Sequence, residues 1–142
     1  LSKGMNRMNN LILVSHGDFC KELKKSAEMI LGSQENIFTV SLLPHEGEKE
    51  FTEKFDAVAD LLEENYIVFS DLLGGTPCNI VSKKIMSGSK FDLYTGMNLP
   101  MIISFVNATM TGNTHTILDE TKESIVKVND LLDADDFNEE DE

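Results

Sequence analysis

The sequence is short of cysteine, of basic residues and of long hydrophobic runs, and each shortage excludes a class of protein. Its 142 residues include only two cysteines, too few for a disulfide framework. Twelve lysines and arginines stand against 25 aspartates and glutamates, so the basic clusters that bind nucleic acid or anionic membranes are lacking. The longest clean apolar run covers residues 11–14, far short of the ~20 residues that span a bilayer. The start of the sequence is polar and has no apolar stretch of a signal peptide, so we expect a cytoplasmic protein with no nucleic-acid partner.

The negative charge is concentrated at the carboxyl end. The formal charge is −13, and residues 133–142 alone hold seven acids and no base. Without them the charge is −6, which is ordinary for a globular domain of this length. We therefore expect one domain over residues 11–132 and a disordered acidic tail over 133–142. Residues 1–10 are expected to be disordered or not native to the protein.

Strand-like and helix-like segments alternate along the chain. Apolar and β-branched runs predict strands at residues 11–14, 37–43, 66–69 and 91–95. Apolar residues at helical spacing predict helices that begin after Asp18, after Gly47, at Pro77 and at Met101. The region after Thr111 is ambiguous, with a helix favoured at 118–122 and a short strand or further helix at 124–129. The alternation predicts an α/β fold, an open and mostly parallel sheet with helices on both faces.

Residues suited to catalysis or anion binding follow three of the predicted strands. The first strand is followed by Ser15, His16 and Gly17, the third by Asp71 and the turn Gly74-Gly75-Thr76, and the fourth by residues 96–100. Ligands of open α/β sheets bind at the carboxyl ends of the strands, where the strand order reverses. If these strands are neighbours, one histidine, one aspartate and one glycine-rich turn share a crevice.

This combination has a chemical logic. A carboxylate that accepts one ring N–H fixes the histidine tautomer and leaves the other nitrogen with a free lone pair. Glycines at a helix N-terminus offer backbone N–H groups to an anion, and Thr76 adds a hydroxyl. An activated His16 facing such a turn is the layout of a phosphohistidine carrier and also of a resting anion site. Each of these features alone has an ordinary structural explanation. His16 could be a polar residue with its hydrogen bonds satisfied, Asp71 a turn residue, and the glycines the start of a helix.

Several other classes of site lack their motifs. The sequence has no P-loop, no G-x-G-x-x-G after the first strand and no G-x-S-x-G nucleophile elbow. The cysteines and histidines show no metal-ligand spacing, so we expect neither a metal nor a cofactor. His45 and His115 read as loop and surface residues, Cys20 as packing, and Cys78 as a buried residue beside the turn.

Five segments, in order, resemble a known family. They are residues 11–17 (LILVSHG), 27–32 (AEMILG), Leu43-Pro44 with Glu46, 71–77 (DLLGGTP) and 95–101 (TGMNLPM). They are similar to the enzyme IIA domain of the mannose/fructose/sorbose family, which belongs to the bacterial phosphoenolpyruvate-dependent sugar phosphotransferase system. The similarity runs from about residue 11 to residue 130 and is weaker beyond Met101.

The resemblance implies a specific reaction. His16 would receive a phosphoryl group on Nε2 from the phosphocarrier HPr and pass it to the IIB component, which phosphorylates sugar entering through the membrane subunits IIC and IID. It implies that Asp71 bonds the other ring nitrogen. It also implies two further groups of residues. Those that bind the phosphate are Ser15, Gly17, Gly74, Gly75 and Thr76. Those that contact the partner proteins are Pro44, Met97 and Asn98. Members of the family are homodimers that exchange a C-terminal strand, here residues 124–129. The sugar stays open, because IIA never contacts it.

Three other functions remain open at this stage. One is the related phosphocarrier subunit that serves dihydroxyacetone kinase, although the Gly-Gly-Thr-Pro turn and residues 98–101 favour the sugar branch. A second is a regulatory module whose phosphorylation at His16 reports sugar status. A third is a non-catalytic domain that binds an anion at the glycine turn.

Overall fold

The computed structural model describes residues 10–114 and 116–133. The predicted disorder of the start and of the acidic tail falls on residues 1–9 and 134–142, outside the described part, and so does the surface placement of His115. These expectations stay predictions.

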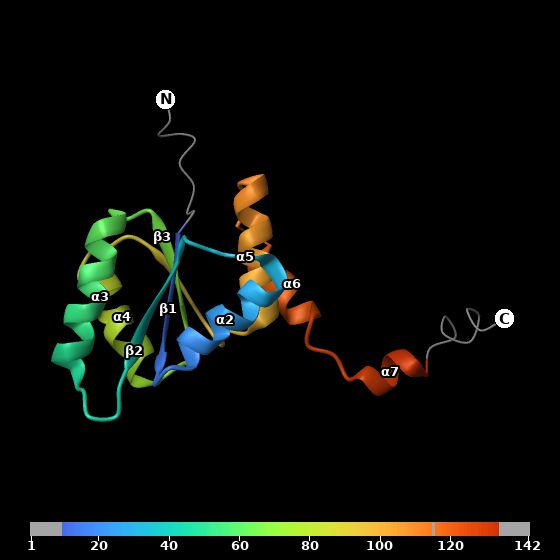
Figure 1. The fold of residues 1–142 in the computed structure, drawn as a ribbon, viewed down its shortest axis with the longest axis horizontal. Coiled ribbons are helices and arrows are strands. Elements are labelled where there is room, and N and C mark those ends of the chain that lie inside the picture. The colour runs from blue at the N-terminus through green and yellow to red at the C-terminus, as the bar shows by residue number, and fades with distance from the viewer. Residues whose placement is uncertain (1–9, 115, 134–142) are drawn as a thin grey trace.

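Four strands form one open sheet, in the order β2-β1-β3-β4 (Figure 1). The strands are β1 (Asn10–His16), β2 (Ile37–Leu42), β3 (Tyr66–Ser70) and β4 (Asp92–Thr95). All three pairings are parallel, and Val14 stands opposite Val40 of β2 and Ser70 of β3, so the carboxyl ends lie at one edge. The predicted open α/β sheet is confirmed, with each strand within a few residues of its expected place.

Helices cover both faces of this sheet. On one face lie α2 (Phe19–Leu31), α5 (Leu99–Thr111) and α6 (Ile117–Glu123), and on the other α3 (Glu48–Leu62) and α4 (Thr76–Met86). Side chains of a strand alternate between the faces, so Leu11 and Leu13 enter the first core and Ile12 and Val14 the second. This double burial explains why residues 11–14 of β1 are an unbroken apolar run. In the described part of the chain, no helix has the length and apolar character needed to cross a membrane.

The C-terminal part differs from the prediction. The apolar helix expected over about 101–106 is longer and forms α5, and α6 occupies the segment predicted as a helix at 118–122. Of the two alternatives for residues 124–129, the short strand does not form: residues 125–127 have no regular structure, and the helix α7 (Val128–Leu132) follows. A strand needs a neighbour to pair with, and after α6 the chain leaves the body, with α7 lying apart from the sheet (Figure 1).

Candidate active site

The candidate site lies where the strand order reverses. The strand β2, which follows β1 in the sequence, lies on one side of β1, and the next strand, β3, lies on the other side. His16 is the last residue of β1, and Asp71 directly follows β3. The two residues that the sequence places at separate strand ends therefore meet at the crevice where open α/β sheets bind ligands.

Asp71 binds His16 twice through a single oxygen. Its Oδ2 accepts hydrogen bonds from the backbone N–H of His16 at 2.9 Å and from ring Nδ1 at 2.8 Å. An ionised carboxylate only accepts, so Nδ1 carries a proton, and in the neutral imidazole Nε2 then keeps its lone pair. The His16 side chain is 50% exposed, whereas that of Asp71 is 13% exposed. The pair therefore presents an oriented imidazole whose free nitrogen is open to a reaction partner.

The glycine-rich turn lies against this imidazole. The Gly75 N–H donates to the Leu72 carbonyl at 3.1 Å, and a Cβ added at Gly75 would stand 3.6 Å from Nε2 of His16. Gly75 is also the N-cap of α4, and Thr76 is the exposed first residue of this helix. Nε2 thus lies beside a helix N-terminus, where backbone N–H groups and the helix dipole favour negative charge.

Ser15 and Gly17 shape the turn that follows β1. The Gly17 N–H donates to the Leu42 carbonyl at 2.7 Å, and its φ of 57° lies in the left-handed region that favours glycine. Ser15 is fully buried, and its hydroxyl donates to the Gly17 carbonyl and accepts from the Cys20 N–H, each at 2.9 Å. The Ser15 side chain therefore fixes the turn from behind and is not available to a bound phosphate.

Asp18 and the cysteines have structural roles. Asp18 occupies the N-cap position of α2, so the helix begins where the sequence predicts, but its side chain makes no capping hydrogen bond. Its carboxylate instead accepts from the hydroxyl of Ser41 at 3.0 Å, which ties α2 to β2. Cys20 and Cys78 are both buried and free, as expected of packing residues.

The loop between β2 and α3 borders the same edge of the sheet. Glu46 Oε1 accepts from the Leu43 N–H at 2.9 Å and from Lys54 Nζ at 2.7 Å. The Lys54 ammonium, followed by the Leu43 N–H, holds the pKa of Glu46 below its ordinary value of 4.5. This pair fixes the loop that carries Pro44 and His45, which are both exposed.

Met97 and Asn98 support the site from the β4–α5 connection. Asn98 caps α5 through Oδ1, which accepts from the Met101 N–H at 2.9 Å. The Met97 N–H donates to the carbonyl of Ser70, the residue before Asp71, at 3.1 Å. The Met97 side chain is 5% exposed and belongs to the core, so it is not available to a protein partner as the sequence suggested.

Exposed apolar residues near the pair are what sequence reasoning missed. Leu72 and Leu73, 60% and 77% exposed, lie in the turn between Asp71 and Gly74. Phe19, placed on the buried stripe of its helix by periodicity, is 48% exposed three positions after His16. The sequence does contain a signal for this exposure. The two leucines lie inside a turn, between an aspartate and a pair of glycines, where no core position is available.

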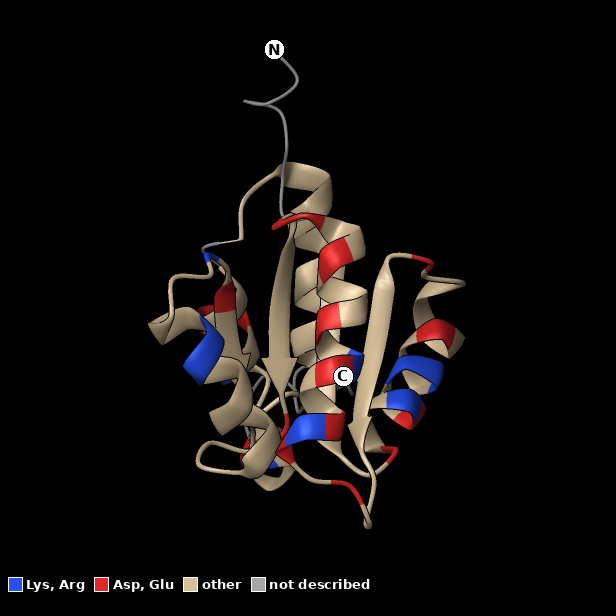
Figure 2. Cartoon of the chain, turned by 90° about the vertical axis from the view of Figure 1, so that its left-hand side faces the viewer, with Lys and Arg blue, Asp and Glu red and all other residues tan. Residues whose placement is uncertain are grey.

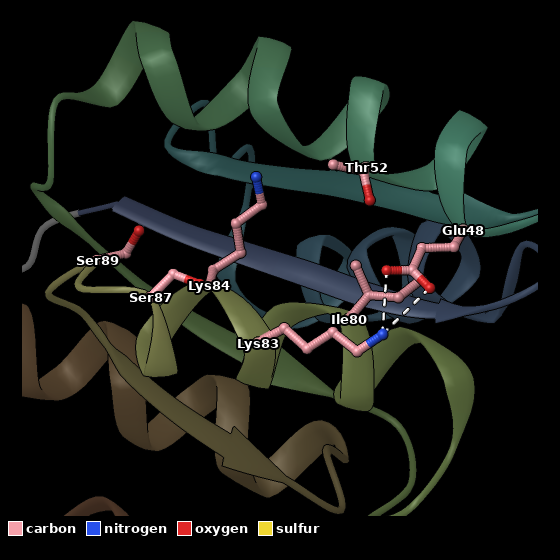
Figure 3. A pocket seen from close by; sticks show the side chains of 7 residues that line it. All are labelled: Glu48, Thr52, Ile80, Lys83, Lys84, Ser87 and Ser89. Atoms are coloured by element: carbon pink, nitrogen blue, oxygen red, sulfur yellow. Dashed lines mark hydrogen bonds and ion pairs between the residues drawn. The ribbon is translucent and has the colours of Figure 1, made fainter.

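A groove between α3 and α4 offers more room but different chemistry. Its volume is about 380 Å³, and its lining includes Glu48, Thr52, Lys83 and Lys84 (Figure 3). The Lys83 ammonium lies 3.2 Å from Glu48, so both charges of this pair are occupied. On the side of the molecule seen in Figure 2, acidic and basic residues are interspersed and form no basic patch. Within the described residues, no group of three His, Cys, Asp or Glu side chains is arranged to hold a metal ion.

Comparison with known proteins gives a consistent set of relatives. A family model described as PTS system fructose IIA component, where PTS denotes the phosphotransferase system, matches residues 10–122. The fructose-specific EIIA component of Bacillus subtilis (strain 168) is 34% identical over 102 residues, 70% of this chain and 70% of that protein. The mannose-specific EIIAB component of Escherichia coli (strain K12) is 29% identical over 100 residues, 69% of this chain and 31% of that longer protein.

A solved structure agrees with these sequence matches. The PTS IIA protein associated with the fucose utilization operon of Streptococcus pneumoniae superposes with a TM-score of 0.76 at 27% identity. The superposition covers 87% of this chain and 96% of that one. The sheet and both helical layers are therefore shared with a PTS IIA protein.

Proposed function

The chain belongs to the family of PTS system fructose IIA components, and from this premise we propose that His16 is a phosphoryl carrier in sugar uptake. In the proposed reaction the Nε2 lone pair attacks the phosphoryl group of phospho-HPr, and the P–N bond on HPr breaks as the new one forms. The group then passes in the same way to a nitrogen or sulfur nucleophile of a IIB component. This relay takes place in the cytoplasm. The membrane subunits IIC and IID act only after it.

The observation that carries the proposal is the hydrogen bond between Nδ1 of His16 and Oδ2 of Asp71 at 2.8 Å. It keeps the proton on Nδ1, so that Nε2 is the nucleophile. When Nε2 becomes phosphorylated, the imidazole ring acquires positive character, which the adjacent carboxylate stabilises. Phosphoryl transfer depends mainly on positioning and electrostatic stabilisation, and this pair supplies both from the chain itself.

The turn before α4 supports the same step. The distance of 3.6 Å between Nε2 and a Cβ built on Gly75 places the acceptor atom against the start of the helix. A phosphoryl group on Nε2 would carry its negative charge next to the N–H groups of this terminus and the exposed hydroxyl residue Thr76. We assign phosphate binding to Gly74, Gly75 and Thr76, with the Gly17 backbone completing the opposite side.

Exposure around His16 suits transient protein partners. The imidazole is half exposed, and exposed apolar side chains follow both members of the pair in the sequence: Leu72 and Leu73 come directly after Asp71, and Phe19 begins α2 three positions after His16. Apolar and aromatic residues at the centre of a surface are typical of protein interfaces. We propose that HPr and IIB dock here in turn, with Pro44 and Asn98 at the edge of the contact.

The C-terminal segment suits a homodimer. Its apolar side chains are exposed in the single chain, at Ile125, Val126, Val128, Leu131 and Leu132. In the described sheet β4 is an edge strand, so its outer side is free to pair. We propose that residues 124–129 pair with the sheet of a second copy. Sedimentation equilibrium should give a dimer that is weakened by Ile125→Asp; a monomer at micromolar concentration would contradict this pairing.

Phosphorylation by purified components tests the relay. The chain is incubated with phosphoenolpyruvate, enzyme I and HPr, and intact mass is recorded for wild type, His16→Ala and His45→Ala. We expect one acid-labile phosphoryl group on the wild type and on His45→Ala, and none on His16→Ala. A folded wild type that is not phosphorylated would overturn the proposal and leave the anion-binding alternative.

A second step separates a relay from a reporter of sugar status. The phosphorylated chain is isolated and mixed with a purified IIB component of the same sugar phosphotransferase family. We expect the phosphoryl group to move to IIB and the mass of the chain to return to its starting value. A phosphorylated chain that never passes the group on would contradict a role in transport.

A further inference from the structure

The His16 imidazole is half exposed but held at more than one of its atoms. Asp71 fixes Nδ1 through the hydrogen bond of 2.8 Å. One hydrogen bond restrains one ring atom and leaves the ring free to rotate about that contact. A defined direction for Nε2 therefore needs a second contact on another part of the ring.

Gly75 supplies that contact through its bare backbone. A Cβ added at Gly75 would stand 2.8 Å from Cε1 of His16, closer than real Cβ atoms approach, and 3.3 Å from the Leu72 carbonyl oxygen. The ring therefore lies directly against the backbone of the turn, at the carbon between its two nitrogens. Any side chain at this position would push the imidazole out of its observed place.

Gly74 and Gly75 are neighbours, but each position requires glycine for a different reason. Gly74 has a φ of +85°, which favours glycine, and a Cβ there would meet nothing within 4 Å. Gly75 has a φ of −80°, which any residue adopts, so its backbone conformation does not require glycine. The requirement at Gly75 is therefore the space taken by the His16 ring.

The backbone that meets the ring is itself fixed. Gly75 donates to Leu72 at 3.1 Å, and its carbonyl accepts from the Asn79 N–H at 2.9 Å. The Asn79 side chain reaches back and donates through Nδ2 to the Gly74 carbonyl at 3.2 Å. Asn79 thus ties the turn to the first turn of α4 and holds the surface that faces the imidazole.

We propose that Gly75 is a positioning residue for His16, which aims Nε2 by packing against Cε1 while Asp71 holds Nδ1, and that Asn79 holds the turn in place for this contact. The inference rests on the proposed function, in which Nε2 is the phosphoryl acceptor. A misplacement of about 1 Å at such an atom costs on the order of 10²-fold in rate.

Gly75→Ala tests this role, with Gly47→Ala as the matched control. Gly47 is likewise a helix N-cap with extended backbone, at the start of α3, and an added Cβ meets only Glu50 Oε1 at 3.6 Å. We expect Gly75→Ala to transfer phosphoryl from HPr about 10²-fold more slowly, and Gly47→Ala to keep the wild-type rate. A wild-type rate in folded Gly75→Ala would overturn the proposal.

Nitrogen NMR of the imidazole gives a readout that a general loss of stability would not move. In the wild type we expect His16 as the neutral tautomer protonated on Nδ1, and in Gly75→Ala a mixture that includes the Nε2–H form. Unchanged ring nitrogen shifts would contradict the inference. Should Gly75→Ala fail to fold, Asn79→Ala decides the matter, since it adds no atoms near the ring; an unchanged spectrum and rate would then overturn the role of the turn.

These readouts also separate the two proposals. An unphosphorylated wild type would refute the relay, whereas the tautomer comparison between wild type and Gly75→Ala would still test whether the turn orients the ring. A phosphorylated wild type with no difference between the variants would refute only the positioning role.

Discussion

The crevice at His16 and the groove between α3 and α4 use charged groups in opposite ways. The groove has a volume of about 380 Å³, and its charges neutralise one another, with Lys83 beside Glu48 and Lys84 beside Asp56 at 2.5 Å. In the crevice the carboxylate engages only one side of the imidazole and leaves Nε2 free. In the groove the charged groups are paired with one another, whereas in the crevice Asp71 engages one ring nitrogen of His16 and leaves the other to a reaction partner.

Under the proposed function, reactivity depends on an unpaired ring nitrogen and not on the volume of a cavity. A carrier that receives and passes a group between proteins needs its acceptor atom at the surface, where a second protein can reach it. A deep cavity would enclose the atom and exclude the partner. An exposed ion pair such as Lys83–Glu48 contributes about 0–1 kcal/mol and suits a structural role.

The largest effect is expected from Asp71→Asn. The amide keeps the shape of the side chain but loses its negative charge, so it no longer fixes the proton on Nδ1 and no longer stabilises the phosphorylated ring. When the amide NH2 group faces Nδ1, the imidazole adopts the tautomer in which Nε2 carries the hydrogen and is not nucleophilic. We expect phosphoryl transfer to slow by about 10³–10⁴-fold, the order seen when an aspartate that orients a catalytic histidine is replaced in this way.

Rapid-quench measurement of transfer from phospho-HPr gives the rate. Asp92→Asn, a change of an exposed aspartate at the start of β4, serves as the control and should keep the wild-type rate. If Asp71→Asn transferred as fast as the wild type, the pairing would have no part in activating His16, and the contrast between crevice and groove would lose its chemical basis.

A smaller effect is expected from breaking an ion pair in the groove. Lys83→Ala and Glu48→Ala each remove one partner of an exposed pair separated by 3.2 Å. A double-mutant cycle by urea unfolding should give a coupling free energy of about 0.2–1 kcal/mol that falls with added salt. Phosphoryl transfer should stay at the wild-type rate in both variants; a tenfold loss in either would make the groove part of the functional machinery.

The sequence is sufficient to predict those parts of the structure that depend on local residue pattern and on the rules of sheet topology. The run at residues 11–14 is apolar on both faces because β1 is central, and the position of His16 at its end follows directly. Because strand ends of a parallel sheet meet at one edge, the sequence predicts that His16 and Asp71 lie together if their strands are neighbours, as β1 and β3 are. Their hydrogen bond at 2.8 Å agrees with that placement.

What depends on tertiary packing was not predictable. Helical period gave Phe19 a place on the buried stripe, yet the helix begins there beside an open turn, so the ring is exposed. The residues around Met97 in the sequence are typical of a surface loop, but its side chain packs in the core with residues of α5 and is buried. The pattern at residues 124–129 allows a short strand or further helix, and the described chain supplies no neighbouring strand with which that segment could pair.

The smallest effect concerns an ion pair that borders the crevice but resembles those of the groove. Lys54 lowers the pKa of Glu46, so the stability that this carboxylate contributes is fully present above its ordinary value of 4.5 and is lost as the pH falls through the lowered pKa. Glu46→Gln should therefore be less stable than the wild type at neutral pH, and the gap should narrow as the pH drops below 4.5. Urea unfolding across this range measures the gap, with the exposed Glu53→Gln as control. A gap that is constant with pH would mean that Glu46 holds the loop beside His16 by its shape and not by its charge.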